Sequence, residues 1–150
     1  MRSLIISVVL ILFSCATHVA TEKSLQLQNR IAEKNFIFRA QTALPAGGQA
    51  VNLTSEYDLR IKGDSVIGFL PYFGRAFTAS YNEEGGIRFT STANEFSVQQ
   101  KKKGGWEINV LPKGANDVRQ LYLSVSPEGY STLQVMLVNR QPISFQGIIM

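Results

Sequence analysis

The feature that most constrains the fold is a series of short apolar–polar alternations, separated by turn residues, between residues 36 and 149. In one of them Tyr57, Leu59 and Ile61 alternate with polar and charged residues, which is typical of a strand with one buried and one solvated face. The expected strands are about six residues long and begin roughly ten residues apart, which predicts a mainly β domain. They cover 36–40, 57–62, 65–70, 74–81, 87–90, 95–101, 106–110, 121–125, 130–138 and 143–149.

Short turns separate most of these strands, with a longer loop expected from Leu44 to about Thr54. Glycine pairs and Gly-Asp or Pro-Glu-Gly sequences are turn formers, so we expect an antiparallel meander. The meander closes on itself as a sandwich or a barrel, and the pattern leaves both open. Two strands joined by one loop each place apolar residues two apart, and we expect these six to share one core: Trp106, Ile108, Val110, Leu121, Leu123 and Val125.

The N-terminus has the pattern of a secretory signal peptide, which we assign to residues 1–20. Arg2 precedes ten apolar residues, Leu4 to Phe13, which are too few to span a bilayer of about 30 Å as a helix. Two endings fit the sequence. Small residues allow cleavage after Ala16, with a weaker site at Ala20, whereas the lipobox-like residues 12–15 would make Cys15 the lipidated first residue of a bacterial lipoprotein.

Residues 21–150 are expected to form a single β-rich domain preceded by a short helix. Leu27 and Ile31 lie four residues apart with Ala32 beside them, which indicates an amphipathic helix from Thr21 to about Lys34. Thr21 is expected to be its N-cap, because a threonine hydroxyl accepts a hydrogen bond from the first turn.

Charge and residue usage exclude several functions. The formal net charge of +4 falls to +3 when Arg2 is removed, which is too low for a nucleic-acid-binding surface. Cys15 and His18 are the chain's one cysteine and one histidine, and both lie in or beside the signal. The domain therefore has no internal disulfide, no Ser-His-Asp or Cys-His nucleophile and no His/Cys metal site, and we expect neither cofactor nor metal.

Carboxylates are the remaining candidates for catalysis. Glu83-Glu84 lies in a glycine-rich hairpin tip, and Glu56 and Asp58 lie on the wet face of one strand. Neither pair resembles two acids facing one cleft, so a carboxylate-dependent hydrolase is the least favoured reading.

Three ordered motifs carry a resemblance to a known family: residues 70–76 (LPYFGRA), residues 104–106 (GGW) and residues 139–145 (NRQPISF). With them, the chain from about Phe36 to Ile149 resembles the Bacteroidota envelope family catalogued as domain of unknown function 4251. The resemblance implies an exported or lipid-anchored protein of the Gram-negative envelope, in the periplasm or at the outer membrane. It carries over no catalytic residue, because the family has no assigned activity.

The candidate ligand-binding residues are Tyr72, Arg75 and Arg140. Arg75 lies among three aromatic residues and a proline, where desolvating a guanidinium is costly unless it meets an acid or reaches water through a cleft. In a structural role it would pair with an acid such as Asp58 or Glu95. In a binding role Tyr72 and Arg75 would form the polar rim of an apolar pocket, with Arg140 as a second candidate.

These observations favour a non-enzymatic binding module for a small apolar or amphipathic ligand or a partner protein. The alternative is a structural or interaction protein of the envelope with a filled core. A binding pocket should measure a few hundred Å³ and have convergent polar groups, whereas a filled core should be accompanied by an exposed apolar patch or an unpaired sheet edge.

Overall fold

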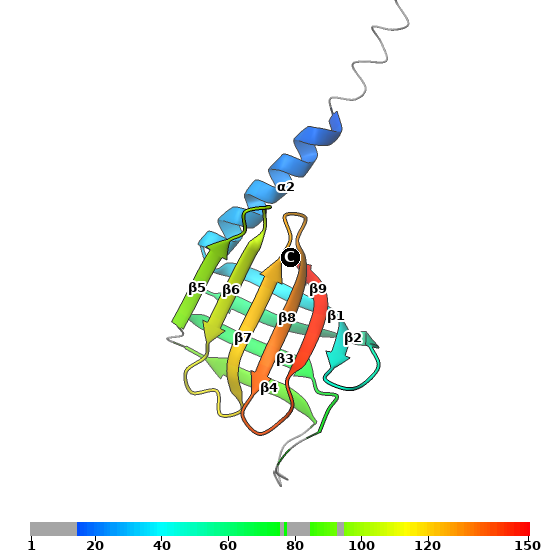
Figure 1. Ribbon diagram of the computed structural model, residues 1–150. Helices are drawn as coiled ribbons and strands as arrows, with labels where there is room; N and C mark the ends of the chain where they lie inside the picture. Colours follow the sequence, from blue (N-terminus) through cyan, green and yellow to red (C-terminus); the bar gives the residue numbers. More distant parts are fainter. Residues whose placement is uncertain (1–14, 76, 78–84, 93–94) are drawn as a thin grey trace, which may run out of the picture.

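The computed structural model describes residues 15–75, 77, 85–92 and 95–150, with side chains from residue 22 onward. Within these residues one helix precedes nine strands, all antiparallel to their neighbours in one sheet (Figure 1). The elements are α2 (Cys15–Ala32), β1 (Asn35–Pro45), β2 (Val51–Lys62), β3 (Ser65–Pro71), β4 (Gly86–Ser91), β5 (Glu95–Gln100), β6 (Trp106–Leu111), β7 (Val118–Val125), β8 (Tyr130–Leu137) and β9 (Ile143–Ile149).

The sheet has the order β4-β3-β2-β1-β9-β8-β7-β6-β5 and curls into a half-barrel. It consists of two meanders, β1–β4 and β5–β9, which join where the first strand pairs with the last. Phe38 lies opposite Ile149 and Ala43 opposite Phe145 at this seam, and a bulge between Ala40 and Thr42 shifts the register. The expected mainly β antiparallel fold is confirmed, and its form is one curled sheet.

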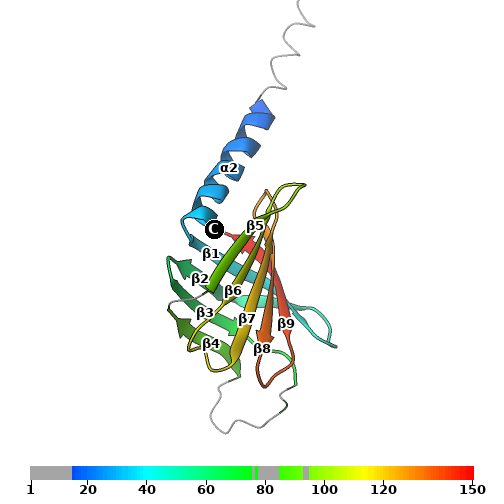
Figure 2. The same ribbon diagram turned by 60° about the vertical axis from the view of Figure 1, so that its left-hand side comes forward.

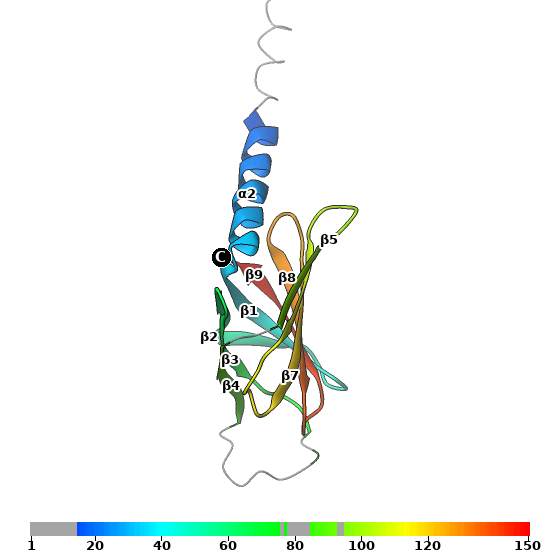
Figure 3. The same ribbon diagram turned by 90° about the vertical axis from the view of Figure 1, so that its left-hand side faces the viewer.

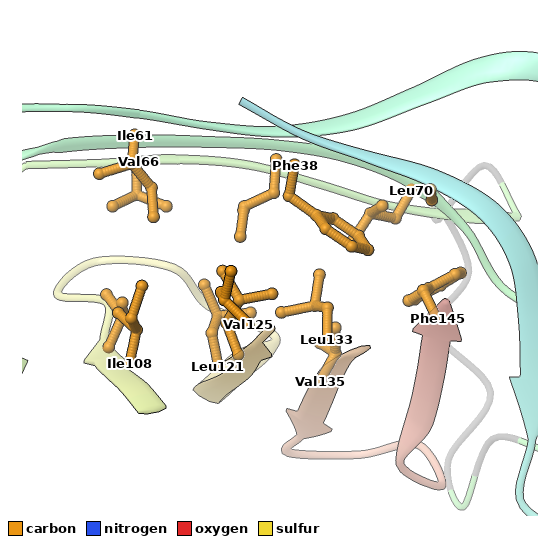
Figure 4. Close-up of a cluster of buried hydrophobic side chains, with 14 of the residues drawn as sticks. Phe38, Ile61, Val66, Leu70, Ile108, Leu121, Val125, Leu133, Val135 and Phe145 are labelled. Carbon is orange, nitrogen blue, oxygen red and sulfur yellow. The ribbon is translucent and has the colours of Figure 1, made fainter. Parts of the chain in front are cut away.

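The two meanders form two layers with the core between them (Figure 3). Alternate residues of both layers point inward and fill the space, as the side chains in Figure 4 show. The six residues expected to share one face are all buried, and Ile108 lies opposite Leu123 across β6 and β7. This part of the predicted core is confirmed.

Two expected element bounds are wrong, and one expected strand is not seen in the few of its residues that the structure describes. Helix α2 begins at Cys15, so Thr21 lies inside it and is not its N-cap, because no proline or glycine interrupts the chain between them. The expected loop 44–54 shrinks to 46–50, since Val51 already pairs with Ala43. The described residues of the expected strand 74–81, namely 74, 75 and 77, are not in a strand, and the others lie outside the described residues.

Helix α2 contacts the sheet with its C-terminal turns and extends away from β1 (Figure 2). Leu27 and Ile31 are buried as expected, whereas Ala32 is exposed. In the part of the chain that the structure describes, no helix is long and apolar enough to cross a membrane.

Candidate functional site

The candidate site lies where the chain leaves β3 at Pro71 and runs alongside the turn between β8 and β9. The backbone N–H of Gln141 donates to the carbonyl oxygen of Arg75 at 3.1 Å, and that of Phe77 donates to Asn139 at 2.8 Å. The Tyr72 hydroxyl lies 2.9 Å from the carbonyl oxygen of Arg75 and 3.1 Å from that of Gln141. Its single proton is therefore shared between two main-chain acceptors, which fixes the segment against the turn.

The Tyr72 ring folds back over Gly74, and this close approach requires a residue without a side chain at position 74. A Cβ atom at Gly74 would lie 2.6 Å from the Tyr72 hydroxyl oxygen, closer than real Cβ contacts. Burial raises the pKa of Tyr72, with the positive charge of Arg140 opposing the shift. The hydroxyl thus remains a hydrogen-bond donor at neutral pH.

Arg140 is the buried centre of the site. Its guanidinium lies 4.5 Å from the centroid of the Tyr72 ring and donates to both an acid and the backbone. The Nε atom is 3.0 Å from Asp117 Oδ2, which Nη2 also contacts, and Nη1 is 3.1 Å from the carbonyl oxygen of Gly86. One side chain therefore connects the start of β4, the loop before β7 and the segment after β3.

Arg75 has a different environment, because its exposed side chain borders a cavity of about 620 Å³. One wall is the turn from Pro45 to Val51, and the other is formed by residues 73–75 and Gln141. The two acids named above as examples of a structural partner are bound elsewhere: Asp58 contacts Arg60 at 2.8 Å, and Glu95 lies 3.4 Å from Lys113.

The structure thus brings Tyr72, Arg75 and Arg140 into one cluster in which they do different things. The side chains of Tyr72 and Arg140 make intramolecular contacts that position the segment, whereas Arg75 is exposed and is one of the residues that line the cavity. Asp117 is the member that sequence reasoning missed. It lies 23 residues before Arg140 in a glycine- and asparagine-rich loop, and no local pattern links the two.

The carboxylates of β2 are paired with arginines. Glu56 lies 2.7 Å from Arg39, and Asp58 is bound by Arg60. Glu83-Glu84 lies outside the described residues. Among the residues that are described, no three His, Cys, Asp or Glu side chains gather into a group that could hold a metal ion.

These features define a β-rich half-barrel domain with a filled interior and an open cleft at one end of its sheet. The chain belongs to DUF4251, a family described as a domain of unknown function, whose sequence model matches residues 18–149. A solved structure of a DUF4251 family protein from Bacteroides eggerthii is similar to it, with a TM-score of 0.65 and 15% identity over 88% of this chain and 87% of that chain. At that identity the likeness shows the fold alone. No curated protein matches the sequence.

Proposed function

We propose that this protein is a non-enzymatic binding module of the cell envelope that holds a small amphipathic ligand in the cleft beside Arg75. The observation that carries the proposal is an exposed guanidinium at the edge of a cavity of about 620 Å³ that also has apolar walls. Ligand sites in proteins have volumes of this order and combine apolar walls with a few polar groups.

The chemistry of the cleft indicates the ligand's parts. Arg75 presents a planar fork of donors suited to a carboxylate or phosphate group. Pro45, Val51 and the 37%-exposed Phe73 offer apolar surface beside it. An acid group attached to a short apolar body would satisfy both features.

Positioning is the role we give to Tyr72 and Arg140. Their hydrogen bonds and ring contact hold residues 72–75 against the β8–β9 turn, so the Arg75 side chain starts from a fixed backbone. Preorganisation of this kind lowers the entropy lost on binding.

The module is proposed to act outside the cytoplasm, in the periplasm or anchored at the outer membrane. The support is the basic start and the ten apolar residues that follow it. The intact mass of protein from its own host tests this. A chain starting with lipidated Cys15 supports a lipoprotein, a start at Thr17 or Thr21 supports a secreted form, and retained Met1 contradicts both.

Native mass spectrometry of protein purified from its own host tests the binding proposal. We expect a bound small molecule in the wild type and its loss from Arg75→Ala. The thermal midpoints of the two ligand-free proteins should be equal, because Arg75 is exposed. Arg119→Ala, at an exposed arginine on β7 that does not border the cleft, is the matched control and should retain the molecule. A ligand-free wild type, or equal occupancy in both variants, would refute the proposal.

The filled interior supports a second candidate, a structural or interaction protein. β4 and β5 are the outermost strands of the sheet, and Ile67 and Phe69 are exposed on β3 at 43% and 37%. Exposed apolar residues beside a sheet edge suit a protein partner. In the same experiment, a copurifying protein that is lost from Phe69→Ser but kept by Arg75→Ala would favour this candidate.

A further inference from the structure

The outer face of β7, β8 and β9, which is turned toward the viewer in Figure 1, carries one exposed charged residue, Arg119 near the start of β7. Between Tyr130 and Met150 the sequence has one residue with a charged side chain, Arg140, and this residue is buried. The exposed surface of a small soluble domain normally consists of about 25–35% charged residues. Besides the apolar Met136 and Ile148, the other outward-facing positions carry hydroxyls, amides and phenol rings: Gln120, Tyr122, Ser124, Tyr130, Thr132, Gln134, Ser144 and Gln146.

A cavity of about 520 Å³ is hollowed into this face. Part of its floor is a row of directly paired residues on neighbouring strands, in which Thr132 lies opposite both Ser124 and Gln146, and Gln146 lies opposite Thr42. The β1 bulge adds a second amide at Gln41. Hydroxyls and amides from four strands therefore line one depression, and each type can both donate and accept hydrogen bonds.

Tyr130 gives the cavity an aromatic wall. It begins β8 directly after the β7–β8 hairpin, and 69% of its surface is exposed, equal to the largest exposure among the described large hydrophobic residues. An exposed ring with a polar hydroxyl is suited to contact with a ligand that has one apolar face and polar edges.

The residues that line the cavity carry little net charge. Lys101 is the one cation among its described lining residues, and none of them is acidic. The Lys101 ammonium is already engaged, since it donates to Ser124 Oγ at 2.7 Å and lies 3.4 Å from Glu107. An anionic ligand would have to compete with Glu107, and an apolar ligand would leave the hydroxyls and amides without partners.

We infer that this cavity on the outer face of β7–β9 binds a neutral carbohydrate, with one sugar ring against Tyr130 and its hydroxyls bonded to Thr132 and Gln146. Sugars match the site because their hydroxyls both donate and accept, while the C–H face of the ring is apolar. The inference is independent of the Arg75 cleft, because the two cavities share no lining residue.

Titration calorimetry with defined neutral hexasaccharides, namely maltohexaose, cellohexaose, mannohexaose and xylohexaose, tests the inference. The hexamer of galacturonic acid is the acidic comparison. We expect at least one neutral sugar to bind, and Tyr130→Ala to weaken it by about tenfold or more while Tyr130→Phe retains most of the affinity. Arg75→Ala should leave this affinity unchanged, which separates the result from a failure of the cleft proposal.

Glutamines on the same outer face supply a matched pair of variants. Gln146 lines the cavity, whereas Gln134 lies on β8 outside it. Gln146→Ala should weaken sugar binding and Gln134→Ala should not, with both variants unfolding at the wild-type temperature. The inference is overturned if none of the neutral sugars binds, if the acidic hexamer alone binds, or if Tyr130→Ala binds like the wild type. It is equally overturned if sedimentation shows a dimer that Thr132→Asp dissociates, because a second copy would then occupy this face.

Discussion

Replacing Arg140 with alanine should destabilise the domain far more than removing an ordinary surface arginine. The substitution removes the cation that pairs with Asp117, the donor to the Gly86 carbonyl and the group stacked on Tyr72. Only 9% of the Arg140 side chain and 19% of the Asp117 side chain is exposed. The alanine variant would therefore leave a carboxylate that is largely shielded from water and has lost its partner.

The magnitude follows from that burial. Breaking a buried ion pair by removing one member costs about 3–5 kcal/mol. Because Asp117 retains some access to water, we expect about 2–4 kcal/mol, a large part of the roughly 5–15 kcal/mol that stabilises a typical domain. With a urea dependence of about 2 kcal/mol per molar, the middle of the usual range, the unfolding midpoint should fall by about 1–2 M.

Trp106 provides the assay, because it is the protein's one tryptophan and is 5% exposed in the folded state. Urea unfolding followed by its fluorescence should show the shift in Arg140→Ala. Lys113→Ala is the control, since Lys113 and Glu95 are 61% and 64% exposed, and such a pair contributes about 0–1 kcal/mol. The double variant Arg140→Ala/Asp117→Ala should lose less than the sum of the single variants, because it strands no charge. An Arg140→Ala midpoint equal to that of Lys113→Ala would refute the reasoning.

Three further predictions concern the sheet. Leu123→Ala should lower the free energy of unfolding by about 2–5 kcal/mol, because Leu123 is buried between the layers, and an unchanged urea midpoint would contradict its place in the core. Gly147→Ala should cost about 2–4 kcal/mol, since its Cβ would lie 2.0 Å from the carbonyl oxygen of Arg39 across the β1–β9 seam, and wild-type thermal stability would exclude that close approach. The Tyr122 hydroxyl lowers the pKa of Glu107, so the carboxylate stabilises the fold above its unfolded pKa of about 4.3 and this contribution is lost as pH falls through the lower native pKa. The stability difference between wild type and Glu107→Gln, measured by urea unfolding, should therefore be present near pH 6 and vanish near pH 2, and a difference independent of pH would be evidence against the hydrogen bond.

The strands and the shared core face could be predicted because their signal is local. Trp106, Ile108 and Val110 are each two residues apart, and this spacing by itself indicates a strand with one buried face. The neighbouring strand β7 has the same spacing. The seam between β1 and β9 has no such signal. Phe38 and Ile149 are 111 residues apart in the sequence. The apolar–polar alternation within a strand does not indicate which other strand it pairs with. Sandwich and barrel therefore stayed unresolved until the pairing was known.

The candidate site shows the same limit at the level of single side chains. The sequence singled out the segment around Arg75 because a guanidinium among aromatic residues is costly to bury without compensation. In the structure the guanidinium that lies over the Tyr72 ring is that of Arg140. The sequence could not say which arginine would be buried. Arg140 follows an asparagine in a turn, a setting typical of exposed residues, yet Asp117 and the Tyr72 ring compensate it.

If the proposed function holds, this division between the two arginines has a functional consequence. A buried guanidinium whose three nitrogens all donate hydrogen bonds resists movement, so Arg140 can fix the backbone of residues 72–75 while its charge is paired with Asp117. Arg75, three residues after the tyrosine that Arg140 covers, then carries its charge to the cleft from a rigid base. Substitution of Arg140 by lysine would keep the charge but lose the guanidinium contact with Tyr72 and replace three donor nitrogens by one. We therefore expect Arg140→Lys to loosen the Arg75 cleft even where the fold survives, whereas the cavity at Tyr130, which Arg140 does not border, should be unaffected.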